Sequence, residues 1–212
     1  MHQPPGPDGP PPAGHTRLLM VRHGQSTWNA QGRWQGQADP PLSSHGRQQA
    51  AAAADRIGAV GAVVSSPQIR ALETATTIAD AIGVGPVIVV DDLRERHAGG
   101  WSGQTTEEIE AAHPGWIDSG RRPDDWEPDQ VVQERALRAL AAIATELPGE
   151  TVLVVSHGGV IGALEDHLEV RHGRTPNLHG RVFDTDGERV VAGRRVELIP
   201  PEIGTGGTPA RV

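Results

Sequence analysis

The 212-residue chain contains no cysteine, no lysine and no tyrosine, and all 19 of its cationic side chains are arginines. Without cysteine there can be no disulfide, no thiolate nucleophile and no cysteine-based zinc site. Without lysine, Schiff-base chemistry and a P-loop lysine are also excluded. These absences remove thiol and lysine chemistry from any site that the chain could form.

Acidic side chains outnumber basic ones, 27 to 19, so the formal net charge is −8 at pH 7. Domains that bind nucleic acids are usually basic overall, so we expect no nucleic-acid partner. A local group of arginines could still bind an anionic substrate. No apolar run approaches the length of a membrane span and no signal-peptide pattern opens the chain. We therefore expect no membrane association, a cytoplasmic location, and a monomer or a homodimer.

The length fits a single domain with a sizeable core. Residues 1–14 are rich in proline and glycine, a composition that cannot build a core, and we predict a disordered leader there. Residues 15–200 are predicted to form the folded domain, and residues 201–212 a flexible tail. No internal repeat is present.

Apolar strand-like runs alternate with helical patterns along the domain. Continuous apolar or β-branched runs predict strands at 16–21, 59–65, 87–90 and 151–155, a hairpin of 181–185 and 189–191 around Asp186-Gly187, and a last strand near 196–199. Apolar residues at helical spacing predict helices over 43–57, 67–82, 105–113, 137–147 and 160–168. The segments between them, 25–41, 91–103 and 115–128, are predicted to be loops. This alternation predicts an α/β fold: a three-layer α/β/α sandwich with a mainly parallel central sheet.

Two of the predicted strands end in the same way, with Arg22-His23-Gly24 after the first and Ser156-His157-Gly158-Gly159 after the fourth. In open α/β sheets, ligands bind beyond the carboxyl ends of the strands. If these strands are neighbours, both imidazoles emerge at one edge and can face each other. Arg22 could then bind an oxyanion, and His23 could act as a nucleophile or an acid–base group. A lone Arg-His-Gly tripeptide would favour a simpler interpretation, a histidine that caps a strand beside a surface charge.

A third element, Ser65-Ser66-Pro67-Gln68-Ile69-Arg70, places Arg70 on the first turn of a helix that follows a strand. The helix N-terminus adds free N–H groups and partial positive charge. Two arginines beside two histidines would form an oxyanion site, and their charge would keep one imidazole neutral and nucleophilic near pH 7. Taken singly, Arg70 could be a solvated helix charge and His157 a satisfied strand end. All four groups at strand or helix ends favour a site.

The chain from residue 18 to residue 199 resembles the histidine phosphatase superfamily, the phosphoglycerate-mutase-like enzymes. The resemblance rests on a series of motifs: residues 22–29 (RHGQSTWN), 34–36 (WQG), 41–43 (PLS) leading into Gly46-Arg47, 65–70 (SSPQIR), Thr74-Ala75, 93–95 (LRE), Gly99 with 101–103 (WSG), and 156–159 (SHGG). It implies the phosphoglycerate-mutase-like fold and a reaction that needs no metal and no cofactor.

The resemblance also assigns roles to individual residues. It makes His23 the phosphorylated nucleophile and Glu95 the general acid, which then becomes the base that activates water. The phosphoryl oxygens would be held by Arg22, Arg70 and His157, with Asn29 and the Gly158 amide assisting. The polar pair Gln35-Gly36, in the first long loop, is a further candidate for binding substrate.

Reasoning from the residues alone leaves two interpretations of Glu95. A carboxyl group near a histidine pair can supply the proton that a leaving alkoxide needs. Alternatively, Glu95 could form a surface salt bridge with its neighbours Arg94 or Arg96, worth little energy. The run from Asp124 to Glu127 is interpreted as a solvated acidic loop rather than a metal site, and no His-Glu-x-x-His or EF-hand spacing occurs.

Departures from the family pattern bear on the reaction. Glycolytic mutases of this group carry a tyrosine near the glutamate and a lysine further on, whereas here the loop reads His97-Ala98 and the chain has neither residue type. Arg121-Arg122 echoes the arginine pair of mutases only loosely. We therefore predict a metal-independent phosphomonoesterase that acts on a small phosphorylated metabolite, such as a sugar phosphate, a phosphoglycerate derivative or a nucleotide-pathway monophosphate. The alternatives are a phosphoglycerate-mutase-type phosphotransferase and a non-catalytic module that binds a phosphorylated ligand.

Overall fold

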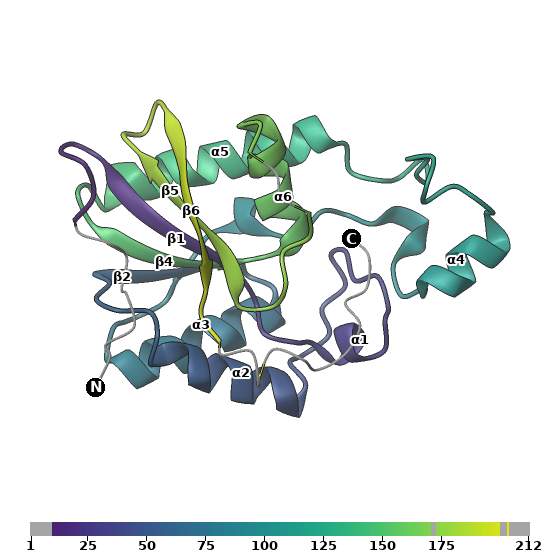
Figure 1. Ribbon diagram of the computed structural model, residues 1–212, viewed down its shortest axis with the longest axis horizontal. Helices are drawn as coiled ribbons and strands as arrows, with labels where there is room; N and C mark the ends of the chain where they lie inside the picture. Colours follow the sequence, from purple (N-terminus) through teal and green to yellow (C-terminus); the bar gives the residue numbers. More distant parts are fainter. Residues whose placement is uncertain (1–9, 171–172, 200–202, 204–212) are drawn as a thin grey trace.

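The computed structural model describes residues 10–170, 173–199 and 203, so most of the predicted leader and tail lies outside the described residues. Six strands form one sheet in the order β3-β2-β4-β1-β5-β6 (Figure 1). Their bounds are β1 Thr16–Arg22, β2 Ala62–Ser65, β3 Ile88–Val89, β4 Thr151–Ser156, β5 His179–Thr185 and β6 Val190–Glu197. The pairs β1–β4, β4–β2 and β2–β3 are parallel, and β1–β5 and β5–β6 are antiparallel. The prediction of a mainly parallel sheet is confirmed.

Helices cover both faces of the sheet, as Figure 1 shows: α2 (Ser44–Ala54) and α3 (Ile69–Ile82) on one side, α5 (Asp129–Glu146) and α6 (Gly158–His167) on the other. The alternation of side chains along β1 explains both contacts. Leu18 and Met20 pack in the core under α5 and α6, whereas Leu19 and Val21 pack in the core under α2 and α3. A strand buried on both faces needs an unbroken apolar run, so the predicted α/β/α sandwich follows from the sequence.

Several element boundaries differ from those predicted. The loop at 25–41 contains the short helix α1 (Thr27–Ala30), whose N-cap is Ser26, because the Ser26 and Asn29 side chains cap each other's backbone N–H groups. Pro67 precedes the N-cap residue Gln68 of α3 instead of lying in its first turn. The hairpin of β5 and β6 is confirmed, but no separate strand forms at 196–199: Val196 and Glu197 are the end of β6, and Leu198 and Ile199 follow it outside any strand.

The loops beyond the carboxyl ends of the strands have a small core of their own. The rings of Trp34, Trp101 and Trp126 contact one another edge to face, with centroids 5.3, 6.0 and 5.8 Å apart. Ile109 of α4 (Thr106–Ala112) and Ile117 pack against them. This aromatic cluster therefore orders loops that the sequence pattern alone left irregular. Within the described part of the chain, no helix is long and apolar enough to cross a membrane.

Candidate active site

The two strand-end histidines meet at the carboxyl edge of the sheet. Strands β1 and β4 are parallel neighbours in a register that pairs Arg22 with Ser156, so the next residue of each strand lies at the same edge. The His23 and His157 rings have centroids 5.2 Å apart and are inclined at 61°. Both are almost fully buried. The expectation that the two imidazoles face each other is confirmed.

The hydrogen bonds of His23 define which of its nitrogens is nucleophilic. Nδ1 lies 2.6 Å from the Gly24 carbonyl oxygen, which can only accept, so Nδ1 carries the proton. Nε2 accepts a hydrogen bond of 3.1 Å from Nε of Arg70. Burial, together with the charges of Arg70 and Arg22, holds the pKa of His23 well below its usual value of 6.5. His23 is thus a neutral imidazole at pH 7 with the lone pair of Nε2 on the side of Arg70.

Gly24 allows the chain to leave β1 close to helix α2. A Cβ atom on Gly24 would lie 2.7 Å from the Gly46 carbonyl oxygen, a separation that real Cβ contacts do not show. Any side chain at position 24 would therefore displace either the N-terminus of α2 or the neighbouring residue His23. This close approach gives a physical reason for glycine at both 24 and 46.

His157 is oriented by a hydroxyl group. Its Nε2 lies 2.8 Å from Oγ of Ser66, and the same oxygen accepts the backbone N–H of Gln68 at 3.3 Å. The Ser66 hydroxyl can therefore donate its own proton to Nε2, which leaves the imidazole proton on Nδ1. Burial is the largest cause that lowers the pKa of His157 well below 6.5, followed by Arg70, His23 and Arg22.

Three buried polar atoms around His23 have no hydrogen-bond partner among the described residues: Nε of Arg22, Nδ2 of Asn29 and Nδ1 of His157. The rest of each side chain is held in place. The Arg22 guanidinium donates to the Thr175 carbonyl at 3.0 Å, and Oδ1 of Asn29 accepts the Ser26 N–H at 3.2 Å. Buried polar groups almost always have a partner, so a group of unpaired donors at one place points to an absent acceptor. An oxyanion would satisfy all three.

Arg70 lies beside His23 as expected, on the first turn of α3. Its terminal nitrogens donate to the carbonyls of Ala38 (2.8 Å) and Gly36 (3.0 Å), in addition to the bond from Nε to His23. These contacts use three of the five N–H donors of a guanidinium. Burial lowers the pKa of Arg70 to about 10, and Glu95 and Asp39 oppose that shift, so the side chain is charged at pH 7.

Gln35 and Gly36, the two candidates in the first long loop, make different contacts near Arg70 and His23. Gly36 contributes its carbonyl oxygen, which accepts from Arg70 and also from Nε2 of Gln68 at 3.2 Å. The Gln35 side chain is buried, and its Oε1 accepts from the Ser26 hydroxyl at 2.5 Å. Both residues thus hold the loop against the site in this structure. Gly158 is the first residue of α6, where the free N–H groups of the helix N-terminus lie.

Glu95 is buried and does not form the surface salt bridge that the sequence left open. Its Oε2 accepts the Gly159 N–H at 3.3 Å, and Oε1 accepts the Arg96 N–H at 2.8 Å. The neighbouring arginines pair elsewhere, Arg94 with Asp91 and Arg96 with Asp129. The Glu95 carboxylate raises the pKa of both Arg22 and Arg70 against the effect of burial, which places it close to the proposed phosphate-binding groups.

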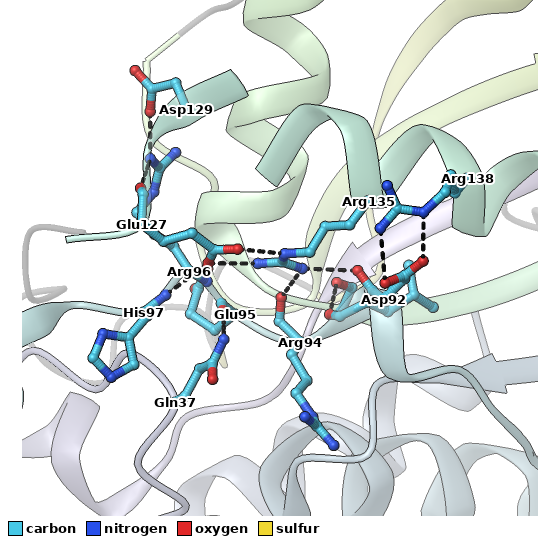
Figure 2. Close-up of polar contacts among 12 residues, drawn as sticks. Gln37, Asp92, Arg94, Glu95, Arg96, His97, Glu127, Asp129, Arg135 and Arg138 are labelled. Atoms are coloured by element: carbon cyan, nitrogen blue, oxygen red, sulfur yellow. Dashed lines mark hydrogen bonds and ion pairs between the residues drawn. The ribbon is translucent and has the colours of Figure 1, made fainter. Parts of the chain in front are cut away.

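Residues that the sequence did not single out hold Glu95 in position. Oε1 of Gln68 accepts the Glu95 N–H at 2.7 Å, and Nε2 of Gln37 donates to the Glu95 carbonyl at 3.1 Å. Arg135 of α5 donates to the carbonyls of Asp92 (2.8 Å) and Arg94 (2.5 Å), on the chain just before Glu95 (Figure 2). Each of these side chains lies 27 to 58 residues along the chain from the backbone group that it contacts. Only Gln68 lies inside a motif that could have identified it.

In the acidic segment Asp124–Glu127, Asp124 and Asp125 are exposed, as predicted for a solvated loop, whereas Glu127 is partly buried. Glu127 forms two bonds to the Arg135 guanidinium, at 2.8 and 3.0 Å, and accepts the His97 N–H at 2.9 Å (Figure 2). Asp125 accepts the Gly100 N–H at 2.9 Å. Half of the segment therefore braces the Glu95 loop. No group of three or more histidine, cysteine or acidic side chains among the described residues is placed to hold a metal ion.

The chain is similar to known phosphatases. The sequence profile of the histidine phosphatase superfamily (branch 1) matches residues 18–180. Glucosyl-3-phosphoglycerate phosphatase of Mycolicibacterium vanbaalenii is 40% identical over 162 residues, which is 70% of this chain and 72% of that protein. Metal-independent phosphoserine phosphatase of Arabidopsis thaliana is 39% identical over 159 residues, 70% of this chain and 67% of that protein.

Solved structures agree with these sequence matches. The structure of mycobacterial glucosyl-3-phosphoglycerate phosphatase in complex with VO3 superimposes with a TM-score of 0.73 at 32% sequence identity. That match covers 83% of this chain and 96% of the other. The sequence profile match over residues 18–180 includes every candidate site residue from Arg22 to Gly158.

Proposed function

The chain belongs to the histidine phosphatase superfamily and is a phosphatase, and from this premise we propose that it is a metal-independent phosphomonoesterase that works through a phosphohistidine on His23. The observation that carries the proposal is the group of unpaired buried donors, on Arg22, Asn29 and His157, around a neutral imidazole. A phosphoryl group fits this arrangement, because it offers three strong acceptor oxygens and negative charge.

The first step transfers the phosphoryl group to the enzyme. Nε2 of His23 attacks phosphorus, a P–N bond forms, and the P–O bond to the leaving group breaks. Arg22, Arg70 and His157 stabilise the charge on the equatorial oxygens, and such preorganised donors are often the largest single contribution to catalysis. Glu95, in its protonated form, gives its proton to the leaving oxygen, which departs as a neutral alcohol.

The second step returns the enzyme to its starting state. The Glu95 carboxylate takes a proton from a water molecule whose oxygen attacks phosphorus. The P–N bond to His23 breaks, inorganic phosphate leaves, and Glu95 is again protonated. One phosphomonoester and one water thus become one alcohol and one phosphate, and neither an oxidant nor a metal takes part.

Electrostatic stabilisation by the protein itself supports metal independence. The guanidinium groups of Arg22 and Arg70, each with a pKa of about 10, remain charged at pH 7 although they are buried. They supply the positive charge that magnesium provides in many other phosphoryl-transfer enzymes. The similarity to a relative named as a metal-independent phosphoserine phosphatase supports the same proposal.

The proposed substrate is a small phosphorylated metabolite, and the proposed assembly is a monomer or a homodimer. The names of the relatives, glucosyl-3-phosphoglycerate phosphatase and phosphoserine phosphatase, are consistent with a small phosphomonoester. We propose no nucleic-acid partner and no membrane partner.

A phosphate-release assay tests this proposal. Purified protein with excess chelator is incubated with a panel of alkyl phosphates and with p-nitrophenyl phosphate, and free phosphate is measured. We expect release that chelator leaves unchanged and that His23→Ala abolishes. Loss of all activity in chelator, restored by magnesium, would contradict the metal-independent mechanism. Phosphoryl exchange between substrates without free phosphate, dependent on a bisphosphate primer, would indicate a mutase instead.

A further inference from the structure

Asn177 and Leu178, the two residues before β5, contact the end of β1 that carries the proposed nucleophile. The Leu178 N–H donates to the Arg22 carbonyl at 3.0 Å. Nδ2 of Asn177 donates to the next carbonyl along the chain, that of His23, at 2.8 Å. Two consecutive carbonyls, one on a phosphate-binding residue and one on the nucleophile, are therefore held from one place in the chain.

Leu178 makes this contact in a backbone conformation that its residue type disfavours. Its φ is 56°, in the left-handed region that favours glycine. The side chain is fully buried in the core under α2 and α3, and the Leu178 carbonyl accepts the Leu198 N–H at 3.0 Å. Backbone strain persists only where packing and hydrogen bonds over-determine it, and it collects at functional positions. The side chain that this conformation fixes beside His23 is that of Asn177.

The peptide group between His23 and Gly24 is held at both ends. Its carbonyl oxygen accepts from Asn177, and its N–H donates to Oγ1 of Thr74 at 3.1 Å. The carbonyl of Gly24 lies 2.6 Å from Nδ1 of His23 and keeps the proton on that nitrogen. Asn177 and Thr74 thus position the residue whose carbonyl leaves the lone pair of His23 on Nε2.

The Asn177 amide also contacts Asn29. Nδ2 of Asn177 lies 3.4 Å from Oδ1 of Asn29, which also accepts the Ser26 N–H at 3.2 Å. An amide oxygen can only accept, so two donors at this atom determine which end of the Asn29 side chain is the oxygen. The other end, Nδ2 of Asn29, is one of the buried donors without a partner among the described residues. The two N–H donors of the Asn177 amide can therefore serve the nucleophile and Asn29 together.

We propose that Asn177 is a positioning residue for phosphoryl transfer, which holds the His23 peptide and turns the Asn29 amide so that its Nδ2 donates to a phosphoryl oxygen. This inference rests on the proposed phosphatase function and adds to it a residue outside the phosphate-binding group. A purely structural Asn177 would close the loop before β5 and contribute stability alone. The two roles differ in their effect on phosphate binding by the folded enzyme.

Asn177→Leu tests the proposal, because leucine has a similar size and no N–H group to donate. Oδ1 of Asn29 then loses one of its two donors, and the amide is free to turn away from the phosphoryl group. A hydrogen bond to a charged group is worth about 10–100-fold in affinity. We therefore expect the inhibition constant of inorganic phosphate to rise about 10–100-fold. An unchanged constant in the folded variant would overturn the proposal.

Burst kinetics provide a second readout for the same variant. Phosphoenzyme formation should slow by a similar factor for alkyl phosphates and for p-nitrophenyl phosphate, because Asn29 would bind the phosphoryl group that both substrates share. Slowing confined to alkyl phosphates would place the effect on proton donation and would contradict the proposal. If Asn177→Leu fails to fold in thermal melting, Asn177→Ala removes the same donor without bulk, with the same expected results.

Arg17→Met is the matched control for lost stability. Arg17 pairs with Asp184 at 2.8 Å at the opposite end of β1 and β5, and both side chains are largely buried. This variant should lower the melting temperature and leave the phosphate inhibition constant unchanged. A rise as large as that of Asn177→Leu would show that lost stability alone weakens phosphate binding, and would contradict a positioning role.

A double-mutant cycle tests the link to Asn29. Asn29→Ala removes the proposed phosphoryl contact itself, so adding Asn177→Leu to it should raise the phosphate inhibition constant by clearly less than in the wild-type background. Losses that simply multiply would overturn the assignment of Asn29 as the group that Asn177 positions.

Failure of this inference can be told apart from failure of the proposed function. If His23 forms the phosphoenzyme in the wild type but Asn177→Leu binds phosphate as the wild type does, only the role of Asn177 is wrong. If His23→Ala retains full activity on every substrate, the proposed mechanism itself is wrong.

Discussion

Replacing Arg135 by methionine is expected to loosen the loop that holds Glu95. Arg135 is almost fully buried, forms two bonds to Glu127 and donates to the carbonyls of Asp92 and Arg94 (Figure 2). Methionine fills a similar length of aliphatic chain but leaves the Glu127 carboxylate without its cation. Breaking one side of a buried pair costs ~3–5 kcal/mol. For a chain of this size the melting temperature should fall by roughly 6–20 °C.

Catalysis should change in a way that lost stability alone cannot explain. If Arg135 positions Glu95, its loss should impair proton donation to the leaving oxygen. Misplacement of a catalytic group by 1 Å can cost about 100-fold in rate. We therefore expect kcat to fall strongly for alkyl phosphates and much less for p-nitrophenyl phosphate, whose leaving phenolate barely needs a proton. The assay is steady-state and burst kinetics on both substrate types well below the melting temperature.

The same helix provides the control. Arg138 lies one turn further along α5 and pairs with Asp92 at 3.3 Å, but both side chains are exposed. Because exposed pairs contribute only ~0–1 kcal/mol, Arg138→Met should change neither stability nor kinetics appreciably. Arg135→Lys keeps the charge but loses the planar fork, so an intermediate effect is expected. Equal slowing of alkyl and p-nitrophenyl phosphates by Arg135→Met would refute a positioning role for this arginine.

Three further predictions concern the site itself. Glu95→Gln should lower phosphoenzyme formation about 10²–10⁴-fold with alkyl phosphates and much less with p-nitrophenyl phosphate; equal losses in burst kinetics would show that Glu95 is not the acid. Arg70→Ala should slow both substrate types by similar factors, because the charge it stabilises lies on the phosphoryl group, and a loss confined to alkyl phosphates would contradict this. Stability should fall as pH decreases below 6.5, since the unfolded chain then binds protons that the folded His23 and His157 do not, at up to about 1.4 kcal/mol per pH unit for each imidazole. Melting curves from pH 5 to 8 should accordingly show a smaller acid loss in His157→Gln than in wild type, and identical slopes would argue against a depressed pKa.

Local signals were sufficient to predict the sheet, its flanking helices and the reactive edge. Unbroken apolar runs such as that of β1 require burial on both faces, and the repeated strand ending at His23 and His157 indicated the place of the chemistry. What local signals could not give is the order of the strands, since β2 and β4 become neighbours through pairing across a separation of 90 residues. That pairing depends on which apolar surfaces fit together in three dimensions.

The supporting residues of the site were missed for a related reason. Asn177 donates to the His23 carbonyl at 2.8 Å, yet it is 154 residues distant in sequence. Ser66 lies inside the 65–70 motif, but its contact with His157, 91 residues away, was not predicted. Arg135 lies outside the helix predicted over 137–147, because α5 begins eight residues earlier, at Asp129, and nothing in its neighbourhood marks it as buried. Single polar residues acquire such roles only when the fold brings buried carbonyls or imidazoles within reach of them.

The most direct test of the account is to trap the phosphoenzyme. The protein is mixed with a phosphomonoester in excess chelator, quenched in alkaline denaturant during the burst phase, and digested for mass spectrometry at high pH. We expect a phosphate adduct on the peptide that contains His23, stable in base, lost in acid and absent from His23→Ala. A phosphate adduct on a different residue, or full turnover with no adduct at any quench time, would contradict it.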